Sequence, residues 1–381
     1  MLTLHADHAH VRAGSHRIAL DAPGTHAFVS HAHLDHYRSL KKAELVLSSP
    51  ETMDLLQARG KAIPQKFVQH HHTEKTENQE STKINLLNAG HVLGSRMLYA
   101  ENTGNDQHDR SNGKISDQGN QNGQTGSAQN GSQGSQSGSG HGGKPIGNGG
   151  QSVLYTGDFL SEDSLTQKAA QPKDCDILLM ECTYGLPQYQ FQDRTEIYDQ
   201  IGKWATAELA AGRIAVIGAY SLGKAQEVVA ALNHAKIAPA VSPPIAALNE
   251  VYQKYGVALD YTLNDPTTLG SGAFAAVVPM HQVKPELAQG LKQAYGRKAS
   301  LSVATGWALN SGYAGCDAAF ALSDHDDFSG LVEFAQSCNP KKVYTTHGPA
   351  DVFAHHLRKA GLDAQPLESL GEKQQTLAQT A

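Results

Sequence analysis

One six-residue stretch, His31-Ala32-His33-Leu34-Asp35-His36, constrains this chain more than any other. It follows a short apolar run, Ala27-Phe28-Val29, which has the character of a buried strand. Imidazole and carboxylate groups are preferred ligands of zinc, manganese and iron. The spacing puts the first two histidines on one side of an extended loop and the last two ligands beyond its bend. The stretch therefore predicts a metal site with room for a second ion; a His-rich surface loop is the alternative.

Other predicted strands lie beside residues of the same chemistry. His91 follows Ile84–Leu87 and lies between two glycines, Asp158 follows Val153–Tyr155, and His347 follows Lys341–Thr346. Because open α/β layers gather function at the ends of strands, we expect these residues to converge. In one allocation, a first ion has the ligands His31, His33 and His91, a second ion has Asp35, His36 and His347, and Asp158 bridges the two.

A centre with two divalent ions suits hydrolysis of a phosphodiester. A water between the ions would lose a proton near neutral pH and attack, and Asp35 would orient it. His325 follows Ala319–Leu322 and is the candidate general acid. Glu181, after Ile177–Met180, would hold His325; a structural carboxylate paired with Arg or Lys is the alternative. Three basic residues are further candidates for contacts with the substrate phosphates: Lys224, Arg297 and Lys298. The alternative is that they lie on solvated helix faces.

Length and charge set broader limits. The chain has 381 residues, enough for two domains or for one large domain with an insertion. Its formal net charge of −6 gives no basic field for nucleic acid, although bound cations would supply positive charge locally. The four cysteines form no CxxC pair and are expected to be free thiols. No stretch of 18 apolar residues occurs, which predicts a soluble cytoplasmic protein without membrane contact.

The order of apolar and polar segments predicts the domain organisation. Alternating strands and helices in residues 185–300 indicate a small α/β domain, inserted between a core of residues 1–184 and its return segment, 301–365. Residues 102–151 are rich in Gly, Asn, Gln and Ser and should form a disordered low-complexity loop. If His91 and Asp158 share a site, the strands that flank this loop form an antiparallel hairpin. Residues 366–381 should form a flexible tail.

Together these motifs resemble the metallo-β-lactamase superfamily, specifically its β-CASP nucleases. The resemblance implies an α/β fold, an αββα metallo-β-lactamase sandwich with an inserted α/β β-CASP domain over the cleft. It also implies phosphodiester hydrolysis with two divalent ions, zinc first and manganese as the alternative. The stretches that carry it are His31–His36, Ala89–Ser95, Thr156–Phe159, Glu181–Gly185, Gly223–Glu227, Ser323–His325 and Thr346–Gly348.

Within that superfamily, Gly306-Trp307-Ala308-Leu309 and Ala321–His325 are similar to DNA-ligase-associated exonucleases, also described as mRNA 3′-end processing factor-like proteins. This similarity implies an exonuclease that acts on DNA in repair, with an ATP-dependent DNA ligase as partner. A histidine at the position of His347 usually accompanies RNA substrates, so an RNA 3′-end processing ribonuclease is the alternative. A small-ester or thioester hydrolase would leave the insertion and His325 without a role. A non-catalytic nucleic-acid-binding protein would have lost ligands.

Overall fold

The computed structural model of the chain describes residues 2–4, 9–13, 16–37, 43–61, 67–68, 72–75, 81–103, 151–264, 269, 272–310 and 312–369. Two predicted segments fall largely outside this range. Residues 104–150 of the low-complexity loop and residues 370–381 of the tail lie outside the described residues.

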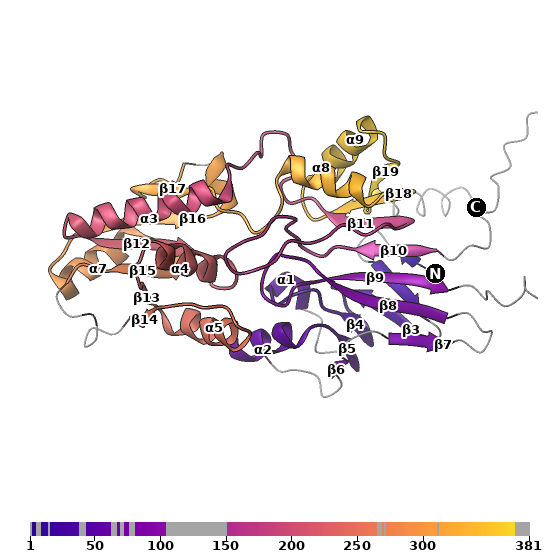
Figure 1. The fold of residues 1–381 in the computed structure, drawn as a ribbon, viewed down its shortest axis with the longest axis horizontal. Helices are drawn as coiled ribbons and strands as arrows, with labels where there is room; N and C mark the ends of the chain where they lie inside the picture. The colour runs from indigo at the N-terminus through magenta and orange to yellow at the C-terminus, as the bar shows by residue number, and fades with distance from the viewer. Residues whose placement is uncertain are drawn as a thin grey trace, which may run out of the picture.

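Two sheets form one half of the molecule (Figure 1). The first has the order β1-β2-β3-β4-β5-β6, and the second has the order β19-β18-β11-β10-β9-β8-β7. The strands of the first are β1 (Leu2–Leu4), β2 (Ala9–Ala13), β3 (His16–Leu20), β4 (His26–Phe28), β5 (Leu45–Leu47) and β6 (Phe67–Val68). Those of the second are β7 (His72–Lys75), β8 (Ser81–Asn88), β9 (Arg96–Thr103), β10 (Ser152–Tyr155), β11 (Ile177–Glu181), β18 (Lys342–Thr346) and β19 (Ala364–Pro366).

Apolar side chains hold these two sheets face to face. Phe28 and Leu47 of the first sheet share one buried cluster with Leu98 and Leu179 of the second. Helices cover both outer faces: α2 (Pro50–Ala58) packs outside the first sheet, and α8 (Phe328–Ser337) and α9 (Ala350–Lys359) pack outside the second. The predicted αββα sandwich is therefore confirmed.

Helix α2 begins where the sequence indicates. Ser49 has extended backbone angles, and its hydroxyl oxygen accepts a hydrogen bond from the Thr52 amide, so it caps the helix. Pro50 occupies the first turn, where its missing N–H costs nothing. Arg59, which follows α2, donates a hydrogen bond to the Ala32 carbonyl, so α2 lies next to the loop that carries His31.

The predicted hairpin is also present. Strands β9 and β10 pair antiparallel, with Val153 opposite Ala100. Because β9 begins shortly after His91 and β10 ends shortly before Asp158, these two side chains meet at one end of the hairpin. The low-complexity segment joins the strands at the other end.

A third sheet, entirely parallel, forms the other half of the molecule (Figure 1). Helices α3 (Arg194–Ala210), α4 (Lys224–His234) and α5 (Pro243–Lys254) pack on one face and α7 (Pro285–Tyr295) on the other. Its strands, in spatial order, are β14 (Thr262–Leu263), β13 (Ala240–Val241), β15 (Ala275–Pro279), β12 (Ile214–Ala219), β16 (Ala299–Ala304) and β17 (Ala318–Phe320).

The third sheet extends past the boundary that was predicted at residue 300. Strand β16 pairs with β12, Val216 lying opposite Leu301, and β17 pairs with β16. The chain therefore returns to the sandwich only after Phe320. The apolar pattern of Ser300–Val303 marks a strand but does not indicate which sheet it joins, because the partner is chosen by tertiary packing.

Two smaller predictions concern the whole fold. None of the helices in the described part of the chain is long and apolar enough to cross a membrane. The four cysteines are free thiols, as their spacing predicted.

Candidate metal centre

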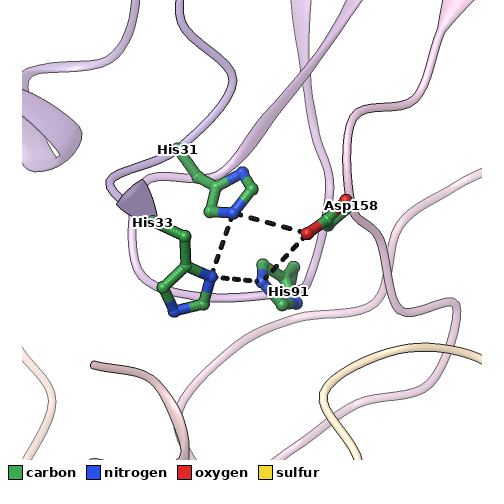
Figure 2. A group of neighbouring side chains, drawn as sticks. All are labelled: His31, His33, His91 and Asp158. Carbon is green, nitrogen blue, oxygen red and sulfur yellow. Dashed lines mark hydrogen bonds and ion pairs between the residues drawn. The ribbon is translucent and has the colours of Figure 1, made fainter. Parts of the chain in front are cut away.

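Four side chains from three separate segments point toward one another at the end of the hairpin (Figure 2). His33 Nδ1 lies 3.0 Å from both His31 Nε2 and His91 Nε2. Asp158 Oδ2 lies 3.6 Å from His31 Nε2 and 3.8 Å from His91 Nε2. The structure therefore brings together three imidazole nitrogens and one carboxylate, the set expected for the first ion.

The outer nitrogens of these rings determine where the protons sit. His33 Nε2 faces the Leu222 carbonyl at 3.2 Å, and His91 Nδ1 faces the Asp324 carbonyl at 2.8 Å. A carbonyl only accepts, so each of these nitrogens carries its proton and donates. His31 Nδ1 faces the Ser30 hydroxyl at 2.9 Å, whose single proton is donated to Asp21. The three inner nitrogens are then lone pairs that face one another.

Burial favours that neutral state. It lowers the pKa of His31 well below the usual value and is the main reason that the pKa of His33 falls to about 4. Burial also lowers the pKa of His91. Metal ligation requires neutral imidazole, so the group is in the ligating form at neutral pH.

A second group shares Asp158 with the first. His36 Nε2 lies 3.3 Å from Asp158 Oδ2, and His347 Nδ1 lies 3.7 Å from Asp158 Oδ1. Asp158 Oδ2 thus faces His36 as well as the first group, and Oδ1 faces His347, so the carboxylate lies between the two groups. His347 has a left-handed backbone, with φ of 53°, and its side chain is 44% exposed to the cleft.

His36 supplies an independent test of whether these residues suit a cation. Its Nδ1 is 2.8 Å from Asp21 Oδ2 and donates to that carboxylate. Its Nε2 is buried and makes no hydrogen bond of good geometry, although Asp158 Oδ2 lies 3.3 Å away. Such orphaned buried atoms are rare and costly, and a cation between His36 and Asp158 would satisfy both groups. The residues present therefore fit a metal ion.

Asp35, predicted as a ligand of the second ion, stands apart from both groups. Its Oδ2 lies 3.7 Å from His36 Nε2, but its side chain is 69% exposed. The mutually close second group consists of His36, Asp158 and His347. Asp35 lies in the first turn of the short helix α1 (Leu34–Tyr37), and its carboxylate lines the open cleft.

His325 and Glu181 meet next to the ligands. His325 Nδ1 lies 2.7 Å from Glu181 Oε1, and Glu181 is buried at the end of β11. The Glu181 carboxylate also accepts hydrogen bonds from the amides of Phe159 and Thr183. Burial opposes the charged imidazole, but the Glu181 carboxylate outweighs it and raises the pKa of His325 to about 9. At neutral pH His325 is therefore a cation able to give up a proton.

Lys224, predicted to meet substrate, has a different environment. Its ammonium group is buried and lies 2.9 Å from Asp324 Oδ1. The same aspartate presents its carbonyl to His91, so Lys224 stabilises the loop that orients a ligand. Lys224 lines the cleft floor but is already paired.

Arg297 and Lys298 do not reach the centre, which corrects their predicted role as substrate contacts. They precede β16, and Arg297 donates a 3.0 Å hydrogen bond to the Gly212 carbonyl, just before β12. The cleft lies at the opposite, carboxyl ends of these strands, beside Tyr220 and Thr305. A six-residue strand separates the two ends by about 20 Å.

A cleft of about 700 Å³ opens over the two groups, between the sandwich and the third sheet. Asp158, His325 and His347 line it from the sandwich side, and Tyr220 and Trp307 line it from the third sheet. Arg59, at the end of α2, adds an exposed cation and donates a hydrogen bond to the Ala32 carbonyl of the metal loop.

Sequence reasoning missed two of these residues. Asp21 accepts hydrogen bonds from Ser30, His36 and Tyr155. It follows directly on β3, the same position after an apolar strand that identified the other acids, so this signal was available. Arg59 had no such signal, because a basic residue at a helix end is common and its distance from the cleft depends on tertiary packing.

Comparisons with known proteins agree with this class of fold. No family model matches the chain. The chain is 26% identical over 364 residues to a protein of Opitutus terrae named "Probable DNA ligase", a match that covers 91% of this chain and 29% of that protein. It is 24% identical over 225 residues to an "RNase J-like protein" of Methanocaldococcus jannaschii, with 54% of this chain and 42% of that protein covered.

The chain thus spans less than half the length of either curated relative. The chain is also similar to a solved structure titled "Crystal Structure of a Protein of Unknown Function from Enterococcus faecalis V583", at 12% identity and a TM-score of 0.49, with 84% of this chain and 75% of that chain covered. Together with the αββα fold, the two sequence matches confirm the resemblance to the metallo-β-lactamase superfamily and its β-CASP branch.

Proposed function

We propose that the chain is a metal-dependent nuclease that hydrolyses phosphodiester bonds of nucleic acid. The observation that carries this proposal is the arrangement around Asp158. One of its oxygens faces three imidazole lone pairs, the other faces His347, and a protonated His325 stands beside them in an open cleft. The similarity to proteins named for RNase J and for DNA ligase supports nucleic acid as the substrate.

The proposed cofactors are two divalent ions, zinc first. His31, His33 and His91 would hold one ion, His36 and His347 the other, and Asp158 would bridge them. When bound, the ions supply Lewis-acid activation of the phosphate and of the attacking water. Ser30, Asp21 and the Leu222 and Asp324 carbonyls keep the ring nitrogens aimed inward.

His325 would protonate the leaving oxygen. Its Nδ1 proton is held by Glu181, so Nε2 is the atom that faces the cleft and gives up a proton. Glu181 keeps the imidazolium charged at neutral pH until the leaving group draws the proton away. This division makes Glu181 a positioning residue and His325 the catalytic one.

Asp35 is proposed as the group that orients the attacking water. Its exposed carboxylate lies on the cleft wall, 3.7 Å from His36 Nε2. An exposed carboxylate beside the ligands can accept a hydrogen bond from water without displacing a ligand. Asp35 would thus hold water on the solvent-facing side of the cleft instead of binding the second ion.

The proposed domain boundaries follow the sheets. The core consists of the sandwich, and the β-CASP domain extends from about residue 185 to Phe320. A small-ester hydrolase would use the same ligands but not the second wall, which belongs to this inserted domain.

The proposed substrate is DNA, in a ligase-associated repair context. The chain would act on it as an exonuclease in the cytoplasm. The protein named "Probable DNA ligase", 29% of which matches this chain, supports an ATP-dependent DNA ligase as the partner. The match to an RNase J-like protein and the presence of His347 favour RNA as the second candidate. The position of the ligands is the same for both.

One experiment tests the proposal and chooses between these substrates. The purified chain is loaded with zinc or manganese and incubated with DNA and RNA strands labelled at either end. We expect metal-dependent release of labelled mononucleotides or short products, faster from DNA. Faster release from RNA would select the second candidate, and intact strands of both kinds under every metal would contradict a nuclease.

A further inference from the structure

Exposed apolar side chains gather in the same cleft. Among the described residues, six large apolar side chains are exposed, and three of them line this cleft. They are Leu34, 50% exposed on the sandwich wall, and Tyr220 and Trp307, 49% and 38% exposed on the opposite wall. A phosphate needs charge rather than apolar surface, so this concentration calls for a second kind of ligand group.

Trp307 is held in place by other aromatic rings. Its ring centroid lies 4.8 Å from that of Tyr184 and 5.5 Å from that of Tyr189. Tyr184 packs so closely on the chain that a Cβ at Gly306 would lie 2.3 Å from its hydroxyl oxygen. Trp307 is thus a supported ring with one side open, on the short 3-10 helix η3 (Gly306–Leu309).

The same cluster extends to the catalytic machinery. The Tyr184 ring centroid lies 6.0 Å from that of His325, so Tyr184 stands between the proposed acid and Trp307. A group stacked on Trp307 would therefore be a near neighbour of the scissile bond. Tyr184 separates Trp307 from His325, so Trp307 would contribute to substrate binding rather than to proton transfer.

Apart from the proposed ions and His325, the side chains of the cleft offer little positive charge for further phosphates. Of the residues that line it, Arg59 and Lys224 are the cationic ones outside the histidines. Lys224 is buried and paired with Asp324. One exposed arginine neutralises about one phosphate, far fewer than a duplex-binding groove requires.

We propose that Trp307, with Tyr220 lining the same cleft, is a stacking platform for an unpaired nucleobase next to the scissile phosphate. This inference rests on the proposed nuclease function and names its substrate form: single-stranded ends of DNA or RNA. Bases within a duplex are stacked on both faces and must be pulled out at a cost before they can lie on a protein ring. Stacking on an aromatic ring is also tolerant of base identity.

Binding is tested first, without catalysis. The chain has two tryptophans, so Trp204→Phe leaves Trp307 as the reporter. Oligothymidylate with phosphorothioate linkages, which resists hydrolysis, is titrated into the metal-loaded protein, with oligouridylate as the RNA arm. We expect saturable quenching of Trp307 emission by each strand that is a substrate, and none by an abasic strand. Unchanged emission with every base-bearing strand would overturn the platform.

Kinetics then separate this inference from the proposed function. Trp307→Ala should lower kcat/KM on single strands by roughly tenfold or more, and Trp307→Phe by much less because a ring remains. Val352→Ala, an exposed apolar residue on α9, is the matched control. Removing the terminal bases of the substrate should lower kcat/KM of the wild type by a similar factor. Trp307→Ala and the abasic ends together should lower kcat/KM no further than either change alone.

The possible failures differ. If the wild type hydrolyses strands and Trp307→Ala does so equally well, the platform is wrong and the nuclease proposal stands. If Trp307 is quenched by phosphorothioate strands whose ordinary phosphodiester counterparts no metal-loaded form cleaves, the nuclease proposal fails and the platform stands. Fully additive losses from the variant and the abasic ends would also overturn the platform, because independent effects mean that ring and base do not meet.

Discussion

The two walls of the cleft are built in opposite ways. On the sandwich wall, His31, His33 and His91 are buried or half-buried, and each outer nitrogen faces a protein acceptor. On the wall from the third sheet, Tyr220 and Trp307 are exposed, and the Trp307 ring is held by contacts with the rings of Tyr184 and Tyr189. The first arrangement fixes atoms in position, and the second offers a surface.

This difference indicates a division of labour. A hydrogen bond at the outer nitrogen of a buried ring leaves the ring one orientation, which metal ligation and proton transfer require. An aromatic surface tolerates a base that slides or turns, which suits a strand that must advance after each cleavage. Substitutions on the sandwich wall should therefore abolish chemistry, and those on the other wall should weaken binding.

The largest effect is expected from the residue shared by both ligand groups. Asp158→Ala removes the carboxylate between them, so it should release bound metal and lower hydrolysis by at least about 10³-fold. Asp163→Ala, an exposed aspartate paired with Lys168, is the matched control and should retain activity. Hydrolysis near the wild-type rate by Asp158→Ala would refute the bridging role.

Removal of the general acid should separate chemistry from metal binding. His325→Ala is expected to lower kcat by about 10²- to 10⁴-fold while metal content stays at the wild-type level. The exposed His355→Ala serves as control. Loss of metal from the His325 variant would instead make this residue a ligand, which its position near His91 and Asp324 also permits.

An intermediate effect is expected from Asp21, which accepts a hydrogen bond from His36 of the second ligand group. Asp21→Asn keeps the shape of the side chain but weakens its acceptor for His36 Nδ1, so affinity for metal should fall by about 10- to 100-fold. A competition assay with a fluorescent chelator measures this change. Unchanged affinity would mean that His36 does not need Asp21 to hold its orientation.

The smallest effect is expected at the cleft mouth. Arg59→Gln removes the exposed cation, so KM for a strand should rise a few-fold at low salt and the difference should fade as salt increases. Lys203→Gln, an exposed cation on α3, is the control. A loss that is independent of salt would point to the hydrogen bond with the Ala32 carbonyl instead.

Much of the sandwich wall could be predicted, because its ligands obey a local rule. A histidine or aspartate directly after an apolar strand identified His91, Asp158 and His347, and the fold does bring them together. The same rule, with strand direction added, excludes Arg297 and Lys298, since they precede a strand and parallel strands share one functional edge.

The other wall could not be predicted in this way. Gly306 and Trp307 were identified by their similarity to a subgroup, but nothing local shows that Tyr184, over 100 residues earlier, supports the indole ring. Likewise, Ser300–Val303 has the same apolar pattern whichever sheet it joins. Contacts between distant segments decide both features, and a single sequence does not contain that pairing directly.

The central claim is a dinuclear centre bridged by Asp158, and elemental analysis of the purified wild-type chain tests it most directly. The metal content is measured by mass spectrometry after loading with zinc and removal of the excess. The structure predicts about two ions per chain. One ion per chain, or none, in a protein with the wild-type circular dichroism spectrum would contradict the claim.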